Sequence, residues 1–279
     1  MGRRHRTTVL SFLGVVISSR QNPIVARYRA AAYGETHDTI LLDGAHLVDE
    51  GLAAGIRLRE AAVTTSADED DQLRSLIDAL QRAHVDVITV TTAVMDALSP
   101  VRSPSAIVAL ADRPSAGGDA LYAGTAAMVV IAVNVQDPGN LGAIVRVAEA
   151  GGASGVVAAG ACADPFGWKA LRGSMGSALR LPIAATPDAE AAVSRARQAG
   201  CRIVATSPRD GRPLFDVDLT GAHALIIGGE GRGLPAALMA SADERVTIPM
   251  AAPVESLNAA VTAALLVYEA QRQRITSRQ

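Results

Sequence analysis

The chain has 279 residues, of which 49% are hydrophobic, and its formal net charge is −2. This length suits one large domain or two ordinary domains with buried cores, and the small net charge means that any surface for nucleic acid must be local. The two cysteines, Cys162 and Cys201, lie far apart and outside any C-x-x-C spacing, which argues against a disulfide framework or a cysteine-rich metal site.

The N-terminus begins with basic residues and continues into an apolar stretch at residues 9–17, a pattern that resembles a signal peptide. The stretch runs into Ser18-Ser19-Arg20-Gln21-Asn22-Pro23 without a small-x-small cleavage site, so we expect no export. No run reaches the roughly 18 apolar residues that a membrane helix needs, and we therefore expect a cytoplasmic protein without a membrane segment. We interpret residues 1–18 as an N-terminal extension for which disorder is expected.

Residues 19–111 are predicted to form a first domain of alternating α/β type. A helix is expected at residues 44–55, and another after the acidic residues 68–71, because carboxylates favour a helix N-terminus. Apolar residues then recur at helical spacing from Leu73 to Leu80. Strands are expected near residues 39–42, 58–63, 85–90 and 106–110.

Arginines cluster at the start of this domain, where Arg20, Arg27 and Arg29 surround Tyr28. Such a group either contacts RNA or is simply the exposed face of a helix. The residues by themselves leave both interpretations open.

Residues 112–122 are predicted to be a linker, because residues 112–119 are polar and rich in proline and glycine. The second domain, residues 123–279, alternates strands with helices, which predicts a largely parallel sheet covered on both faces. Ligands of such sheets bind beyond the carboxyl ends of the strands. The strands are expected near residues 126–133, 155–158, 181–184, 202–206, 224–227 and 245–248, and the loops after Val133, Thr206, Ile227 and Ile248 are the candidates for chemistry.

The loop after Val133 leads into a helix through Asp137-Pro138-Gly139-Asn140. On a helical wheel, Gly139, Gly142 and Arg146 lie together, roughly opposite an apolar face that includes Leu141 and Ile144. Two missing side chains would let an anionic ligand approach the helix start, and Arg146 adds a forked donor suited to phosphate. Residue by residue, Asn140 could be only an N-cap and Arg146 only a solvated side chain, but their grouping favours a phosphodiester site.

The loop after Ile227 places four glycines around one carboxylate, Glu230. Its glycines do not fit G-x-G-x-x-G, and the chain has no G-x-x-x-x-G-K-[ST], so a nucleotide- or NAD-binding oxidoreductase is disfavoured. The loop is either an ordinary glycine-rich turn or a backbone-lined pocket in which Glu230 holds an amine or an arginine.

The loop from Ile248 to Asn258 precedes a long helix in which Leu257, Val261, Leu265 and Tyr268 recur at three- and four-residue intervals. Ser256 has the position of an N-cap, which alone would explain it. Asn258 is more informative, because an asparagine in the first turn gains little from helix propensity. The five histidines show no metal-ligand spacing, and we expect no metal.

Together these loops resemble, in order and spacing, the three signature motifs of the SpoU/TrmH-type RNA 2′-O-ribose methyltransferases of the SPOUT superfamily. The resemblance covers essentially the whole second domain. The first domain is similar, more loosely, to the family's substrate-recruiting module, a small α/β fold like some ribosomal proteins. The matching positions are Asn134-x-x-Asp137-Pro138-x-Asn140-x-Gly142-Ala143-Ile144-x-Arg146, Gly228-x-Glu230-x-x-Gly233-Leu234, Ile248-Pro249-Met250 and Glu255-Ser256-Leu257-Asn258, with Arg172-Gly173-Ser174-Met175-Gly176 and Arg180-Leu181-Pro182 between them.

The resemblance implies a second domain folded as a trefoil-knotted, mostly parallel sheet with flanking helices. It also implies S-adenosylmethionine as cofactor and a homodimer with the active site at its interface. In that family the glycines of the second loop would clear space for the adenosine and methionine groups. The implied catalytic residues are Asn140, Arg146, Glu230, Ser256 and Asn258; the implied cofactor-binding residues are Thr206, Gly228, Gly229, Ile248, Met250 and Leu257; the implied substrate-binding residues are Arg20, Asn22, Arg29 and Arg172.

The activity that follows from the resemblance is methylation of a ribose 2′-hydroxyl in structured RNA, with 23S ribosomal RNA preferred over tRNA because of the recruiting domain. A tRNA methyltransferase and a non-catalytic RNA-binding relative are the alternatives, and the intact polar set argues against the second. The family proposal makes Arg146 the group that takes the hydroxyl proton. Because a charged guanidinium offers donors and no acceptor, we interpret Arg146 instead as a clamp for phosphate that stabilises the developing alkoxide.

Overall fold

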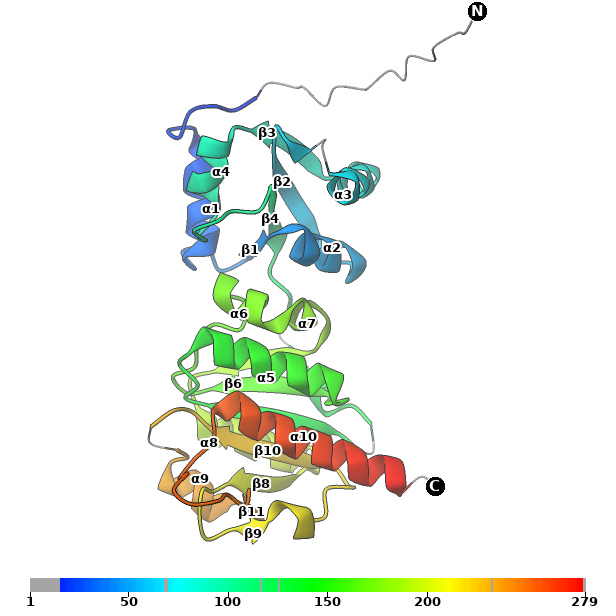
Figure 1. Ribbon diagram of the computed structural model, residues 1–279. Coiled ribbons are helices and arrows are strands. Elements are labelled where there is room, and N and C mark those ends of the chain that lie inside the picture. Colours follow the sequence, from blue (N-terminus) through cyan, green and yellow to red (C-terminus); the bar gives the residue numbers. More distant parts are fainter. Residues whose placement is uncertain (1–15, 68–69, 116, 125, 232, 278–279) are drawn as a thin grey trace, which may run out of the picture. The chain divides into compact units, whose positions relative to one another are not determined.

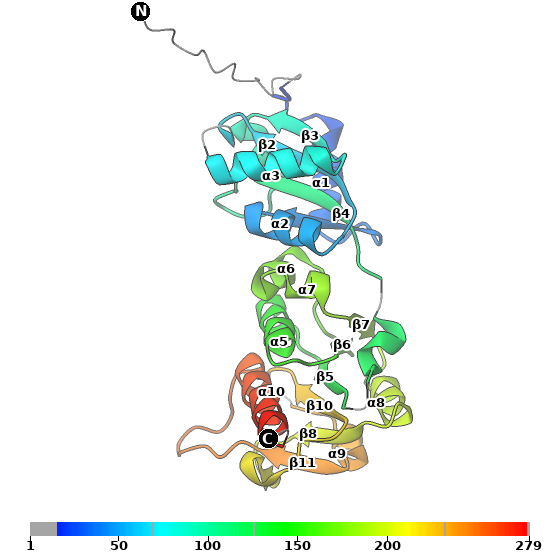
Figure 2. The ribbon, with the colours of Figure 1, turned by 90° about the vertical axis from the view of Figure 1, so that its right-hand side faces the viewer.

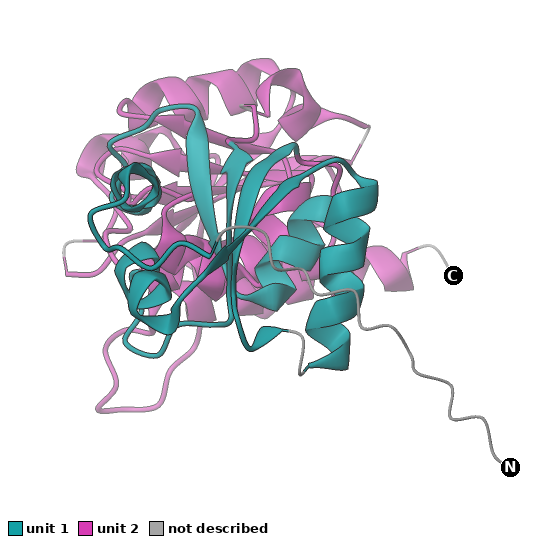
Figure 3. Ribbon diagram, turned by 90° about the horizontal axis from the view of Figure 1, so that it is seen from above, with its two compact units in different colours: residues 1–52, 57–112 teal, residues 53–56, 113–279 magenta. Residues whose placement is uncertain are grey.

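The structure is a computed structural model that describes residues 16–67, 70–115, 117–124, 126–231 and 233–277. It divides into two compact units, residues 1–52 with 57–112 and residues 53–56 with 113–279 (Figure 3). Residues 1–15 of the expected extension lie outside the described residues, as do residues 68 and 69 of the acidic stretch. Ile17 forms an isolated parallel bridge with Val90.

In its described residues, the first unit holds a mixed four-stranded sheet in the order β1-β4-β2-β3 (Figure 1). Strands β1 and β2 run antiparallel to β4, and β3 runs parallel to β2. The elements are α1 (Pro23–Ala32), β1 (Thr39–Asp43), α2 (Ala45–Ala53), β2 (Leu58–Thr64), α3 (Asp71–Arg82), β3 (Asp86–Val90), α4 (Thr92–Leu98) and β4 (Ile107–Asp112).

The acidic stretch begins a helix, as the sequence predicts. The carboxylate of Asp70 is the N-cap of α3 and accepts hydrogen bonds from the backbone N–H groups of Gln72 and Leu73 at 2.9 and 3.2 Å. The recurring apolar residues from Leu73 to Leu80 are buried. Capping of this kind satisfies N–H groups that have no partner inside the helix, which fixes where α3 starts.

In its described residues, the second unit holds a seven-stranded sheet in the order β7-β6-β5-β10-β8-β11-β9, with every recorded strand pair parallel. This confirms the expected parallel α/β architecture. The elements are η2 (Gly118–Tyr122), β5 (Met128–Val133), α5 (Pro138–Ala150), β6 (Gly155–Ala159), α6 (Trp168–Ser174), α7 (Ser177–Arg180), β7 (Ile183–Thr186), α8 (Ala189–Gln198), β8 (Arg202–Thr206), β9 (Arg212–Pro213), η3 (Leu214–Asp216), β10 (His223–Gly228), α9 (Ala236–Ser241), β11 (Glu244–Thr247) and α10 (Ala259–Thr276).

Helices cover both faces of this sheet. Figure 2 shows α8 and α9 on one side, where they pack on the alternate β5 residues Val129, Ile131 and Val133, and α5 with α10 on the other. The four strands β5, β10, β8 and β11 are neighbours and parallel, so the loops at their carboxyl ends meet at one edge. These are the four loops that the sequence analysis predicts as candidates for chemistry. The trefoil knot and the likeness of the first unit to ribosomal proteins stay predictions.

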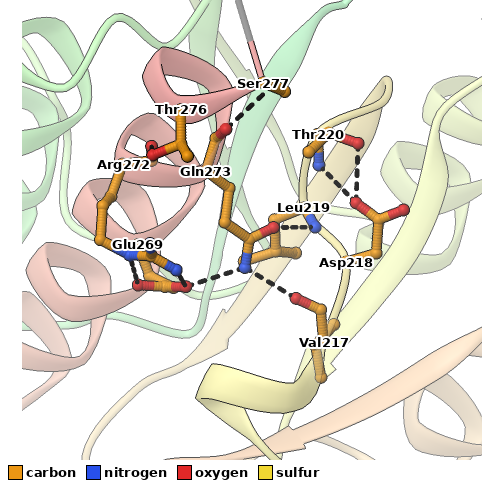
Figure 4. A network of polar contacts seen from close by, with 9 residues as sticks. All are labelled: Val217, Asp218, Leu219, Thr220, Glu269, Arg272, Gln273, Thr276 and Ser277. Carbon is orange, nitrogen blue, oxygen red and sulfur yellow. Dashed lines mark hydrogen bonds and ion pairs between the residues drawn. The ribbon is translucent and has the colours of Figure 1, made fainter. Parts of the chain in front are cut away.

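The second half of α10 is fastened to the segment before β10 by a polar network (Figure 4). The side chain of Gln273 donates to the Val217 carbonyl at 2.9 Å and accepts the Leu219 N–H at 2.7 Å. Glu269 accepts from Gln273 and from Arg272, which lowers the pKa of its carboxyl, with the hydrogen bond from Arg272 as the main cause. These bonds hold the helix whose other end reaches the candidate site.

Across the described ranges, no helix has the length and apolar character needed to cross a membrane.

Candidate active site

A cavity of about 550 Å³ is lined by the loops after Thr206, Ile227 and Ile248, while the described residues of the loop after Val133 stay outside the lining. Its volume falls in the range of pockets that hold small molecules, roughly 300–1,000 Å³. All six residues that the resemblance assigns to the cofactor line it, together with three of the five assigned to catalysis. These nine residues are Thr206, Gly228, Gly229, Ile248, Met250 and Leu257, with Glu230, Ser256 and Asn258.

Asn140 joins the polar residues of two loops into one hydrogen-bonded row. Its Nδ2 donates to Oε1 of Glu230, and its Oδ1 accepts from Nδ2 of Asn258 at 2.9 Å. The Oδ1 of Asn258 is occupied by the N–H groups of Ala260 and Val261 at the start of α10, which fixes the orientation of both amides. The row therefore ends with the carboxylate of Glu230 as an acceptor at the cavity.

The helix caps differ from the sequence interpretation. Asn258 is the N-cap of α10, so the interpretation of Ser256 as the cap is wrong and the N-cap role belongs to Asn258. Asp137 is the N-cap of α5 and accepts the Asn140 N–H at 2.7 Å, so Asn140 is not a cap either. The Asn140 side chain is thereby left for the row that crosses to Glu230 and Asn258.

The glycines of the second loop are required mainly by the protein itself. A Cβ on Gly228 would lie 2.7 Å from the carbonyl carbon of Gly233, and one on Gly229 would lie 3.0 Å from the Val135 nitrogen. Gly231 and Gly233 have φ values of +95° and +64°, which glycine adopts without strain. The expectation that Gly228 and Gly229 clear space for a ligand needs correction, because other backbone fills that space while the loop still lines the cavity.

Gly142 is likewise used for packing. It is buried, and a Cβ there would lie 2.9 Å from the Ser174 nitrogen and closer still to the Ala170 carbonyl oxygen. The interpretation of Gly142 as an opening for an anionic ligand is therefore wrong, since α6 occupies that side of α5. Arg146 is exposed, does not line the cavity, and forms no hydrogen bond or ion pair within the described part of the chain.

Helix α10 is apolar on two sides. It buries small and aliphatic residues such as Ala263 and Leu266. Val261, Leu265 and Tyr268, which we call the α10 stripe, are 47%, 40% and 50% exposed. The apolar residues that recur every three or four positions thus predict the helix correctly, but they lie on its exposed face and not in the core.

The predicted substrate-binding residues belong to both units: Arg20, Asn22 and Arg29 lie in the first, and Arg172 lies in the second. Asn22 is the N-cap of α1, and Arg20 donates to the Ala93 carbonyl at 2.8 Å. Arg29 is exposed with its guanidinium 5.8 Å from the centre of the Tyr33 ring, and Arg172 is exposed on α6. Arg172, which belongs to the same unit as the cavity, is not among the described residues that line it.

Tyr28 cannot contact RNA in this structure. Its side chain is fully buried, and burial together with the nearby Glu60 raises its pKa well above the usual value. One terminal nitrogen of the Arg27 guanidinium donates to both carboxylate oxygens of the same Glu60, at 3.0 and 2.9 Å. All three arginines of the basic group predicted at the start of the first domain, Arg20, Arg27 and Arg29, are exposed.

The two cysteine thiols are part of the packed structure. Cys201 is buried, and Cys162 accepts the Val135 N–H while burial raises its pKa. In the ranges that the structure describes, no three or more His, Cys, Asp or Glu residues are grouped to hold a metal ion.

Several lining residues escape sequence reasoning. Ser207, next to Thr206, and Thr262, one turn after Asn258, could have been found as neighbours of predicted residues. Met239 and Val246 supply part of the apolar wall, and the fold alone brings them there, whereas Leu234 beside them is a position of the second motif.

Comparison with known proteins agrees with this geometry. Residues 127–268 match the SpoU rRNA Methylase family, and residues 41–116 match the domain described as RNA 2′-O ribose methyltransferase substrate binding. The 23S rRNA (guanosine(2553)-2′-O)-methyltransferase RlmP of Bacillus subtilis is 31% identical over 83% of this chain and 88% of its own. The 23S rRNA (uridine(2479)-2′-O)-methyltransferase of Streptomyces viridochromogenes is 37% identical over 63% of each chain.

Among solved structures, the SpoU methyltransferase AviRb from Streptomyces viridochromogenes in complex with AdoMet is similar with a TM-score of 0.83 and 28% identity. The match covers 92% of this chain and 99% of that one. The family that the loop motifs predict is thus confirmed: the chain belongs to the SpoU rRNA Methylase family of RNA 2′-O-ribose methyltransferases and has their substrate-binding domain.

Proposed function

We propose that this protein, as a homodimer, transfers a methyl group from S-adenosylmethionine to a ribose 2′-hydroxyl of 23S ribosomal RNA. The observation that carries the proposal is the row Glu230–Asn140–Asn258 beside a cavity of cofactor size. The preference for 23S RNA is supported by the relatives from Bacillus subtilis and Streptomyces viridochromogenes, which are named for that substrate.

The cavity suits S-adenosylmethionine because it combines an apolar wall with polar edges. Leu234, Met239 and Val246 offer the flat apolar contact that an adenine ring needs, and Thr206 and Ser256 offer hydroxyls. Bound there, the cofactor would supply an electrophilic methyl group on its sulfonium. The protein then has to align a ribose oxygen and exclude water.

The polar row provides the alignment. Its amides are held by the start of α10 and by the Glu230 carboxylate, so none of its members has to be ordered when RNA arrives. Preorganised groups of this kind orient a reacting hydroxyl without having to reorganise when it binds. In this proposal Glu230 accepts a hydrogen bond from the ribose 2′-hydroxyl and thereby orients the oxygen.

Arg146 belongs, in this proposal, to the site of the second copy. It follows Asn140 by six residues on α5, which turns its side chain about 120° away from Asn140 and places it about 9 Å along the helix axis. Helix α5 packs beside α10 (Figure 1), with Gly151 against Val267. Helix α10 also carries the exposed α10 stripe. An exposed apolar stripe is typical of a protein interface, so a partner docked there would lie beside Arg146.

The substrate class is tested by incubating the purified protein and labelled S-adenosylmethionine with unmodified 23S rRNA, 16S rRNA and tRNA. We expect label in 23S rRNA at one position. Label in tRNA alone would replace the proposed substrate, and binding of RNA without label in any of the three would support a non-catalytic relative.

The placement of Arg146 is tested by mixing inactive subunits. Arg146→Ala and Glu230→Gln subunits are unfolded together and refolded, so that half of the dimers contain one of each. If Arg146 acts across the interface, each mixed dimer has one intact site and about a quarter of the parent activity returns. Absence of recovery would place Arg146 in its own chain's site.

A further inference from the structure

One wall of the cavity is formed by a segment with few polar contacts to the rest of the chain. Residues 249–257, which we call the strap, connect β11 to α10 and line the cavity through Met250, Ser256 and Leu257. Residues 251–256 are exposed, and in Figure 2 this stretch extends from the body of its unit as the orange loop before α10. The strap carries five positions of the third motif, among them Ser256 and Leu257, so its position decides whether these two reach the cavity.

Two polar contacts of the strap occur in the described part of the chain. The first is a turn within it, from the Val254 N–H to the Ala251 carbonyl at 3.1 Å. The second reaches outside: the Glu255 carboxylate forms an ion pair with the Arg209 guanidinium at 2.9 Å. Arg209 therefore supplies the polar link between the strap and the opposite side of the cavity.

Arg209 stands on a fixed support. It lies in the turn after β8, whose Ser207 and Pro208 line the cavity. The Ser207 N–H donates to the Val246 carbonyl, and the Gly211 N–H donates to the Thr247 hydroxyl, both at 2.9 Å. These bonds fasten the turn to β11 on either side of Arg209, so the strap is the part that would move.

We propose that Arg209 is a positioning residue for methyl transfer, which acts by holding Glu255 and thereby closing the strap over the cofactor. This inference rests on the proposed function, because it takes S-adenosylmethionine as the molecule in the cavity. Arg209 itself does not line the cavity within the described residues. Both side chains are largely exposed, 70% and 79%, so the closure is weak and sensitive to salt. A releasable closure suits a cofactor that must leave after each turnover.

The test compares four variants of the full chain: Arg209→Gln, Glu255→Gln, the double variant, and Arg212→Gln as the control. Arg212 carries the same charge three residues further on but faces Glu244 at 3.7 Å instead of the strap. Protein preloaded with tritiated S-adenosylmethionine is chased with unlabelled cofactor, and the dissociation rate is measured at low and high salt.

We expect both single variants to release the cofactor about two- to fivefold faster than the parent, in line with the small contribution of exposed ion pairs. The double variant should release no faster than either single one, and Arg212→Gln should match the parent. High salt should speed release from the parent but not from the variants. The KM for S-adenosylmethionine should rise while kcat stays within twofold, which a general loss of structure would not produce.

Unequal single variants, or an additive double variant, would overturn the proposal. A second readout does not need the cofactor: hydrogen exchange of the strap amides should be several-fold faster in both variants, and unchanged exchange would also overturn it. If the parent fails to bind S-adenosylmethionine while the exchange result holds, the proposed function fails and the role of Arg209 in holding the strap survives.

Discussion

Gly142 offers a sharp test of how the first motif works. In Gly142→Ala, the new Cβ would lie 2.9 and 3.0 Å from the Ser174 nitrogen and the Gly173 carbonyl carbon, and closer to the Ala170 carbonyl oxygen. Real Cβ atoms essentially never approach within 3.0 Å, and all three neighbours are backbone, so α6 has to shift as a body. We therefore expect the substitution to act on packing rather than on ligand access.

The size of the effect follows from two opposing terms. Overpacking of a core typically costs about 1–3 kcal/mol. Replacing a glycine by alanine inside a helix gains about 1 kcal/mol in intrinsic propensity. The steric term wins because the contact is with backbone on a second helix, and the difference between the two terms lowers the free energy of unfolding by up to about 2 kcal/mol.

The assay is urea unfolding followed by tryptophan fluorescence, since the chain's one tryptophan, Trp168, begins α6 and reports on that helix. Gly139→Ala is the matched control: its Cβ meets just the Asp137 carboxylate at 3.0 Å, and we expect a change within about 0.5 kcal/mol. Gly142→Ala as stable as the parent, but with lost RNA binding, would refute this reasoning and restore the view of Gly142 as an opening for an anion.

Three further substitutions test other parts of the structure. Asn258→Asp keeps an N-cap on α10 but cannot donate to Asn140, so unfolding should change by less than about 0.5 kcal/mol while methyl transfer falls at least tenfold; retained turnover would remove the amide row from the mechanism. Leu265→Glu places a charge in the α10 stripe and should yield a monomer by light scattering, whereas an intact dimer would move the interface elsewhere. Burial lowers the pKa of His223 to about 4, below its ordinary value of 6.5, so the fold favours the neutral form. Above pH 6.5 the imidazole is neutral in both the folded and the unfolded chain. As the pH falls from 6.5 to 4 the unfolded chain binds a proton first, and the free energy of unfolding declines by about 3 kcal/mol. Relative to the parent, His223→Gln should therefore show a flatter stability profile between pH 6.5 and 4, and parallel profiles would contradict the assignment.

The largely parallel sheet of the second domain could be predicted because its pattern is encoded locally. Apolar runs such as residues 128–133, separated by helical patterns, specify a parallel sheet, and the glycine-rich loop around Glu230 marks the end of a strand. The carboxyl ends of parallel strands share one edge of a sheet, which predicts Thr206, Gly228 and Ile248 at the same edge, but the order β10-β8-β11 that makes them neighbours comes from the structure.

What could not be predicted depends on partners that are distant in sequence. A helical wheel places Gly142 on the side away from Leu141, but it does not reveal that α6 packs there. The cap of α10 could be assigned to Ser256 or Asn258 until the helix start was known. Likewise, Met239 and Val246 join the cavity through the packing of α9 and β11, which no local pattern records.

The most direct test of the central claim is the chemical position of the transferred methyl group. The protein is incubated with 23S rRNA and S-adenosylmethionine labelled in its methyl group, the RNA is digested to nucleosides, and the labelled nucleoside is identified by mass spectrometry. We expect the label on the ribose 2′-oxygen, and its loss in Glu230→Gln and Arg146→Ala. A labelled methyl group on a base, or label that persists in both variants, would contradict the site assigned here.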